Sequence, residues 1–225
     1  MRIAYVMLTC NKYMDTRVKW QLETSLSTVP REDIYYLGHR MDESRRLFHW
    51  GAGDEYNDLP KKLGGVFMNM TFDGYDWVFI ADDDTYVFTK KLEEFVSKQS
   101  SKSLLVTGHK LDHIKKKWFE YYSGGSGTLL SHALYTKLCT YVKTCKEPYI
   151  HWCADICLGK WLIETNESVK KEGDIMIELN HPGFHPNQYD SKKNDITKAI
   201  TFHHLKERKH YLDLHLFEYT EKVIN

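Results

Sequence analysis

The chain lacks a surplus of charge, long apolar runs and internal repeats. Its 225 residues hold 31 Lys+Arg and 31 Asp+Glu, so the formal net charge is zero. No overall positive field therefore draws it to nucleic acid or an anionic membrane. No apolar stretch approaches the roughly 20 residues that span a bilayer, and the apolar start 1–9 is too short for a secretion signal. We expect a single domain over 1–225, soluble as given, that begins with a strand.

Paired cysteine motifs are also missing. None of the five cysteines shows the two-residue spacing of zinc sites; they are Cys10, Cys139, Cys145, Cys153 and Cys157. Reduced core thiols are the expected state, and one disulfide in a secretory compartment is the competing possibility. A structural zinc on Cys153, Cys157 and His151 is a weaker alternative.

Strand and helix patterns alternate through the first half of the chain. Strands are expected at 3–9, 34–37, 75–81 and 104–107, and helices at 15–26 (capped by Asp15), 59–70 and around 92–96. The second half has a glycine-rich segment at 121–130, a helix capped by Ser131, a helix around 156–162, a loop at 180–194 and a last helix around 212–219. This order predicts an α/β fold whose mixed, mostly parallel central sheet has helices on both faces.

Three consecutive carboxylates, Asp82, Asp83 and Asp84, end the apolar strand that starts near Tyr75. A solvated acidic turn is the simple interpretation, but strand-forming residues flank the triplet on both sides. Acidic side chains are rarely buried without a partner, so a cation is expected to balance them. Hard divalent ions take carboxylate oxygens and share their remaining positions with substrate phosphates. In a parallel sheet the triplet and Thr9 would lie on the same edge.

Four segments carry a resemblance to a known family. They occur in the order Tyr75–Val87, Ser123–Gly127, Asp155–Lys160 and Phe202–His204. Together they resemble the inverting glycosyltransferases of family 31, the Fringe and core-1 β-1,3-galactosyltransferase group. Ser126 stands where that family's Gly-Gly-Ala-Gly segment has Ala, and the first 60 residues match only loosely, through Thr9 and Arg17.

The resemblance implies a GT-A, Rossmann-like fold and transfer of a hexose from a nucleotide sugar, a UDP-sugar, to a hydroxyl of a glycan or glycoconjugate. It also implies Mn²⁺ (or Mg²⁺), with Asp84 as the direct ligand and His203 as the second; His204 is the alternative in a shifted register. Asp82 and Asp83 are expected to orient the ribose, the donor sugar or metal-bound water, and Asp82 is also expected among the metal-binding residues. A divalent cation stabilises the charge left on the departing diphosphate.

The same resemblance makes Asp155 the candidate general base, which takes the proton from the acceptor hydroxyl. The alternative is that Asp155 caps a helix beginning at Ile156. The family often has a second acidic residue just before this position, and here it is Ala154. The acceptor side therefore departs from the family pattern.

Other candidate contacts are weaker. Gly124 and Gly125 are expected to line the donor-sugar or acceptor pocket, or else to form a plain turn. Trp152 is favoured for stacking on a sugar ring because it lies near Asp155; the other aromatic candidates are Trp118, Tyr121 and Tyr122. Thr9 and Arg17 are expected to contact the nucleotide.

Several alternatives stay open. The chain could be an inactive relative that binds a glycan or partner protein. A nucleotidyltransferase is disfavoured because the loop 10–13 has no glycine, and a calcium-binding lectin because no Asp-x-Asp-x-Asp-Gly pattern occurs. Residues 1–110 are expected to bind the nucleotide sugar and 111–225 the acceptor. Oligomeric state is open, as is the compartment: a stand-alone cytoplasmic enzyme, or the catalytic domain of a Golgi-luminal one.

Overall fold

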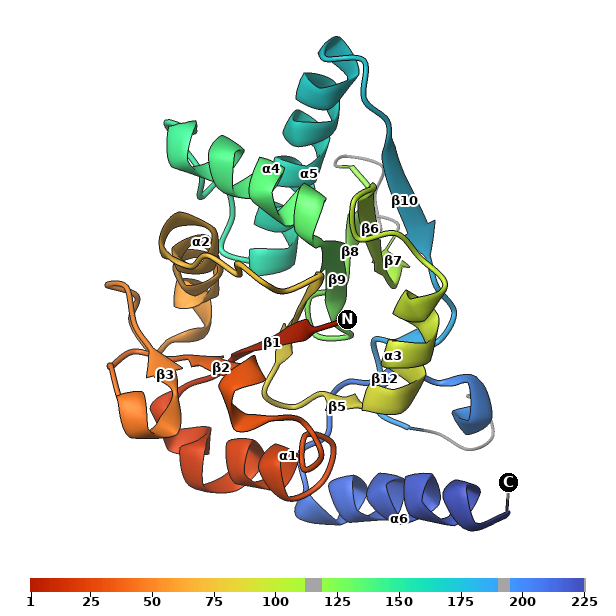
Figure 1. Cartoon of the computed structure of the whole chain (residues 1–225). Helices are drawn as coiled ribbons and strands as arrows, with labels where there is room; N and C mark the ends of the chain where they lie inside the picture. The colour runs from red at the N-terminus through yellow and green to blue at the C-terminus, as the bar shows by residue number, and fades with distance from the viewer. Residues whose placement is uncertain (112–118, 190–194, 225) are drawn as a thin grey trace.

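A seven-stranded sheet runs through the centre of the molecule in the order β10-β6-β9-β4-β1-β2-β3 (Figure 1). The computed structural model describes residues 1–111, 119–189 and 195–224, so Trp118 lies outside the described residues. The strands are β1 (Ile3–Leu8), β2 (Ile34–Leu37), β3 (Leu47–Phe48), β4 (Trp77–Asp82), β6 (Leu104–Gly108), β9 (Thr128–Ser131) and β10 (Met176–Asn180). Neighbours are parallel except that β9 runs antiparallel to both β4 and β6. The predicted mixed, mostly parallel sheet is confirmed.

Helices cover both faces of this sheet. On one face lie α2 (Leu59–Asn69), α4 (His132–Thr144) and α5 (Ala154–Lys171); on the other lie α3 (Thr89–Ser97) and a helical path made of Asn11–Tyr13, Met14–Val18 and α1 (Lys19–Glu23). Strand β1 is buried along its whole length because its alternate side chains enter two different cores. No described helix is long and apolar enough to cross a membrane.

A second, three-stranded sheet lies beside the carboxyl edge of the first. It consists of β5 (Tyr86–Val87), β11 (Phe184–His185) and β12 (Thr201–Phe202), and α6 (Arg208–Ile224) packs on it through a core that includes Tyr86, Phe202 and Tyr211. The remaining short elements are β7 (Lys110–Leu111), β8 (Tyr121–Tyr122) and 3₁₀ turns at Arg31–Asp33, Glu43–Arg45, Tyr56–Asp58 and Ile196–Lys198. Because β12 pairs with β5 directly after the aspartate turn, the segment after β12 reaches the triplet.

Some local predictions are confirmed and others are wrong. Ser131 caps α4, since its hydroxyl accepts a hydrogen bond from the backbone N–H of Leu134 at 3.2 Å. Asp15 does not cap a helix: it lies inside the π-helical turn Met14–Val18, and the helical path already begins at Asn11. Helix α5 begins at Ala154 with Cys153 in the cap position, so Asp155 belongs to its first turn.

Strands β9 and β10 were not predicted. Strand β9 comes from the glycine-rich segment, where Thr128–Ser131 is fully buried between two antiparallel neighbours. Strand β10 is an edge strand whose side chains are mostly exposed, Ile177 among them, so its short apolar run does not mark a buried strand.

Candidate functional site

The aspartate turn lies at the carboxyl edge of the central sheet. In the parallel pair β1–β4, Leu8 is opposite Asp82, so the residues that follow each strand emerge side by side. Thr9 and the triplet therefore share one edge, as predicted. Buried Gln21 supports the turn, with its side-chain amide donating to the carbonyl of Thr85 at 2.9 Å.

Asp83 points inward and is held by protein partners on both oxygens. The hydroxyl of Thr9 donates to Oδ2 at 2.7 Å, and Arg17 donates to Oδ1 at 2.9 Å. The guanidinium of Arg17 also lies over the ring of Tyr13, 3.8 Å from its centroid. Burial raises the pKa of Asp83 to about 6, against the opposing effects of Thr9 and Arg17. The side chains of Thr9 and Arg17, predicted to contact the nucleotide, thus bind Asp83.

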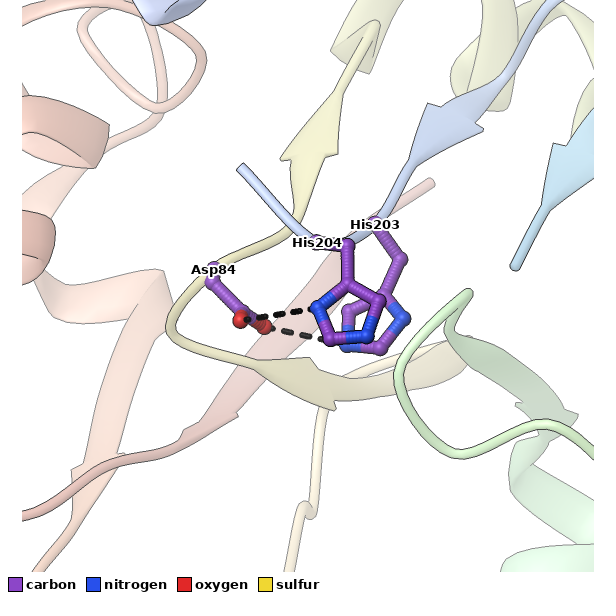
Figure 2. A group of neighbouring side chains, drawn as sticks. All are labelled: Asp84, His203 and His204. Atoms are coloured by element: carbon purple, nitrogen blue, oxygen red, sulfur yellow. Dashed lines mark ion pairs between the residues drawn. The ribbon is translucent and has the colours of Figure 1, made fainter. Parts of the chain in front are cut away.

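Asp84 faces two histidines from the segment after β12 (Figure 2), and a lysine of the same segment also reaches it. Its Oδ1 lies 3.0 Å from Nε2 of His203, while Oδ2 lies 4.0 Å from Nδ1 of His204 and pairs with the ammonium of Lys206. Burial opposes ionisation, but the hydrogen bonds from His203 and Lys206 hold the pKa of Asp84 well below its usual range. Burial alone would lower the pKa of His203, yet its hydrogen bond with Asp84 leaves it raised.

This cluster fits a divalent metal ion. One ligand atom each from Asp84, His203 and His204 lies within 4.8 Å of the others. Nδ1 of His203 lies 2.9 Å from the carbonyl of Pro186, which can only accept, so Nδ1 carries the hydrogen. In the neutral ring this leaves the lone pair on Nε2, the atom directed at Asp84. A carboxylate and imidazole set of this kind suits Mn²⁺ better than Ca²⁺.

Gly125 makes room for His203. A Cβ placed on Gly125 would overlap the imidazole ring of His203, whereas one on Gly124 would lie at an ordinary 3.4 Å from Cβ of Asp155. The carbonyl of Gly125 also accepts a hydrogen bond from the hydroxyl of Thr85 at 2.5 Å. The glycine-rich segment therefore packs directly against the histidine motif.

Two adjoining cavities meet at the triplet. The larger, about 310 Å³, is lined on one side by Thr9, Tyr13, Arg17, Asp54, Tyr56 and Lys62 and on the other by Asp82–Asp84, His203, His204 and Lys206. The smaller, about 100 Å³, is lined by Asp82, His203, Tyr56, Gly124, Gly125 and Asp155. Asp82, His203 and Tyr56 thus border both. The structure brings together the residues that the sequence had placed in four separate segments.

Asp155 projects from the first turn of α5 into the smaller cavity. Its Oδ1 accepts from the backbone N–H of Ile156 and from the thiol of Cys153, each at 2.9 Å. Burial and the neighbouring carboxylate raise the pKa of Cys153 to about 12, so the thiol stays a donor. All five cysteines are free thiols. Trp152 is 54% exposed and its ring lies 5.7 Å from that of Tyr56, which places it at the rim.

Sequence reasoning missed several residues of this site. Lys62 is 3% exposed and donates to the carbonyl of Thr9 at 2.7 Å and to Asp54 at 3.0 Å. Its position among the apolar residues of the predicted helix 59–70 could have indicated that this lysine is buried. Tyr13, Tyr56 and Lys206 had no signal of their own, because isolated tyrosines and lysines are common on loops and surfaces.

Comparison with known proteins gives the family and the fold of the chain. Residues 2–209 match the model of the family described as Fringe-like. The chain belongs to the Fringe-like family of glycosyltransferases. Among its relatives are chondroitin sulfate synthase 3 of Homo sapiens and of Mus musculus, each 24% identical over 187 residues, or 77% of this chain and 21% of the relative. The chain therefore spans about a fifth of the length of these relatives.

The fold also has solved counterparts. An active-site mutant of LgtC superposes with a TM-score of 0.50 at 11% identity, covering 95% of each chain. This likeness identifies the architecture as the GT-A glycosyltransferase fold.

Proposed function

We propose that this chain is a metal-dependent, inverting glycosyltransferase that moves a hexose from a UDP-sugar to a hydroxyl of a glycan or glycoconjugate. The observation that carries the proposal is the juxtaposition of two groups across joined cavities. Asp84 lines the larger cavity and Asp155 the smaller one, and Asp82 and His203 border both.

Asp84 and His203 would hold the divalent ion, with His204 as a further imidazole nearby. Such an ion supplies positive charge that stabilises the negative charge developing on the leaving diphosphate. Asp83 contributes indirectly, because it fixes Arg17 at the wall of the larger cavity. Asp82, which borders both cavities, is placed to contact the donor sugar between them.

The larger cavity is the proposed nucleotide site. Tyr13, stacked under Arg17, offers an aromatic surface, and partly exposed Asp54, paired with buried Lys62, offers a carboxylate to a base or ribose. Apart from the segment after β12, its wall comes from residues before 110. This supports a donor-binding first half and an acceptor-binding second half.

The smaller cavity is the proposed acceptor site. Inversion requires a base on the face of the sugar opposite the leaving group. Asp155 meets that need because it lines the smaller cavity, which adjoins the larger one, whereas Asp84 lines only the larger cavity. Tyr56 and Trp152 lie next to it as an exposed aromatic pair on which a sugar ring can stack.

The test is a thermal-shift titration with UDP in the presence of Mn²⁺ or EDTA, followed by a panel of nucleotide sugars assayed for Mn²⁺-dependent hydrolysis. We expect UDP to protect the chain only with Mn²⁺, and Asp84→Asn to abolish that protection. Protection that is indifferent to EDTA would remove the metal role. Metal-dependent UDP binding without turnover of any sugar, alone or with glycan acceptors, would favour an inactive binding relative.

A further inference from the structure

The ammonium of Lys206 lies on the carboxylate that the proposed function gives to the metal ion. It pairs with Oδ2 of Asp84, whereas His203 approaches Oδ1. The side chain of Asp84 is 6% exposed and that of Lys206 is 48% exposed. Lys206 therefore reaches a buried carboxylate from the open side of the larger cavity, which it also lines.

The conformation of the backbone before Lys206 directs the side chain of Lys206 toward the triplet. His204 has a φ of 70°, a left-handed conformation that non-glycine residues rarely adopt. The next residue, Leu205, donates its backbone N–H to the carbonyl of Asp84 at 3.0 Å, and its side chain is buried. This turn fixes the start of the Lys206 side chain within reach of the cavity. A strained backbone that is held by its surroundings is typical of functional segments.

Arg17, the other cation at the triplet, is held differently. Its side chain is 13% exposed, bonded to Asp83 at 2.9 Å and placed over the ring of Tyr13, and its guanidinium lies 3.6 Å from Oδ2 of Asp84. Among the described residues, Asp84 is the ion-pair partner of Lys206, and the flexible lysine side chain can redirect its charge by rotation. Of the two cations, Lys206 is the one that can change partners at little cost.

We propose that Lys206 exchanges partners during donor binding: it neutralises Asp84 until a divalent ion takes that carboxylate, and it then pairs with the diphosphate of the donor. This inference rests on the proposed function. A dication on Asp84 repels an ammonium at contact distance, and a diphosphate bound to the same ion brings anionic oxygens into the cavity that Lys206 lines. Lys206 thereby competes with the free ion for the carboxylate of Asp84, but it stabilises the bound complex of ion and nucleotide.

Loss of the lysine should therefore change two affinities in opposite directions, that for Mn²⁺ alone and that for UDP in the presence of Mn²⁺. In Lys206→Met, Mn²⁺ alone should bind about threefold more tightly, because a half-exposed competing charge is gone. UDP at saturating Mn²⁺ should bind about tenfold more weakly, because one charge-assisted hydrogen bond is lost. Free Mn²⁺ is measured by electron paramagnetic resonance, and UDP binding by titration calorimetry. Lys206→Gln repeats both measurements should the Met variant fold poorly.

Lys209→Met is the matched control, since Lys209 is also exposed but pairs with Asp213 on α6. It should leave both affinities unchanged. If the wild-type chain binds neither Mn²⁺ nor UDP, the proposed function itself fails. If the wild type binds both and Lys206→Met shifts only one affinity, or neither, the exchange is overturned while the proposed function stands.

Discussion

Gly125→Ala should release the metal ion without unfolding the chain. The added methyl would overlap the imidazole of His203, whose ring has little freedom. Its Nδ1 is bonded to the carbonyl of Pro186 at 2.9 Å, its Nε2 lies 3.0 Å from Asp84, and it stacks on His204 with centroids 4.7 Å apart. The ring must therefore move, and its contact with Asp84 is the one that the displacement breaks.

The magnitude follows from that contact. We take the loss of one imidazole ligand to weaken the free energy of Mn²⁺ binding by about as much as the loss of a charge-assisted hydrogen bond, about 1.5–3 kcal/mol. Mn²⁺ affinity should fall by about 10- to 100-fold, since about 1.4 kcal/mol is one factor of ten. Overpacking a buried site costs about 1–3 kcal/mol of stability, a fall in melting temperature of about 2–4 °C for each kcal/mol in a chain of this size.

The neighbouring glycine provides the control. In Gly124→Ala the new methyl would lie 3.4 Å from Cβ of Asp155, an ordinary contact, so Mn²⁺ affinity should match the wild type. Mn²⁺ binding is followed by electron paramagnetic resonance and folding by thermal melting. If Gly125→Ala binds Mn²⁺ as well as Gly124→Ala does, His203 is not a metal ligand and the register with His204 must be reconsidered.

Other substitutions test separate parts of the site. Asp155→Asn should cut transfer by about a hundredfold or more while UDP affinity in Mn²⁺ stays the same; unchanged turnover would reduce Asp155 to a structural residue of the first turn of α5. Thr9→Val removes the hydroxyl donor from buried Asp83 and should lower the free energy of unfolding, measured in urea, by about 1–3 kcal/mol. Asp54→Asn deprives buried Lys62 of its carboxylate and should destabilise the chain by about 1–2 kcal/mol at about pH 7. Burial opposes ionisation of Asp54, but the N–H of Asn11 and the ammonium of Lys62 hold its pKa below the usual value. Its contribution is therefore present above about pH 4 and lost as the pH falls through the folded-state pKa, so the difference between wild type and Asp54→Asn should shrink in acid melts. A difference that persists unchanged in acid would refute the ion-pair explanation.

The sequence predicted the parts of this site that depend on local pattern. An apolar strand ending in Asp82–Asp84 had to emerge at the carboxyl edge of a parallel sheet, and the structure has it there beside Thr9. The pairing of Asp84 with His203 needed the resemblance to a known family, because no local pattern connects β4 with the segment after β12. Strand pairing between β5 and β12 is what brings them together.

Other features depend on long-range packing and could not be predicted. Strand β9 pairs with β4 on one side and β6 on the other, and all four of its residues are buried. The sequence of this glycine-rich segment does not indicate that burial. The position of Lys206 depends on the left-handed backbone of His204, which no residue preference indicates strongly. The cap of α5 fell on Cys153, a residue with no capping preference, so the role of Asp155 could not be separated from capping beforehand.

Three adjacent carboxylates are tolerated here because the turn after β4 sends them into three different environments. Asp83 is bonded inward to Thr9 and Arg17, and Asp84 turns to His203 and Lys206. Asp82 faces the junction of the cavities, where burial and the charge of Asp84 raise its pKa to about 7. Because the pKa of Asp82 is raised to about 7 and that of Asp83 to about 6, the three carboxyl groups are not all fully ionised at neutral pH, although the pKa of Asp84 is lowered. A divalent ion at Asp84 would favour ionisation of Asp82 as well, because it replaces a repelling charge with an attracting one. In the proposed function, full ionisation of the triplet would therefore come from binding of the ion and not from exposure to solvent.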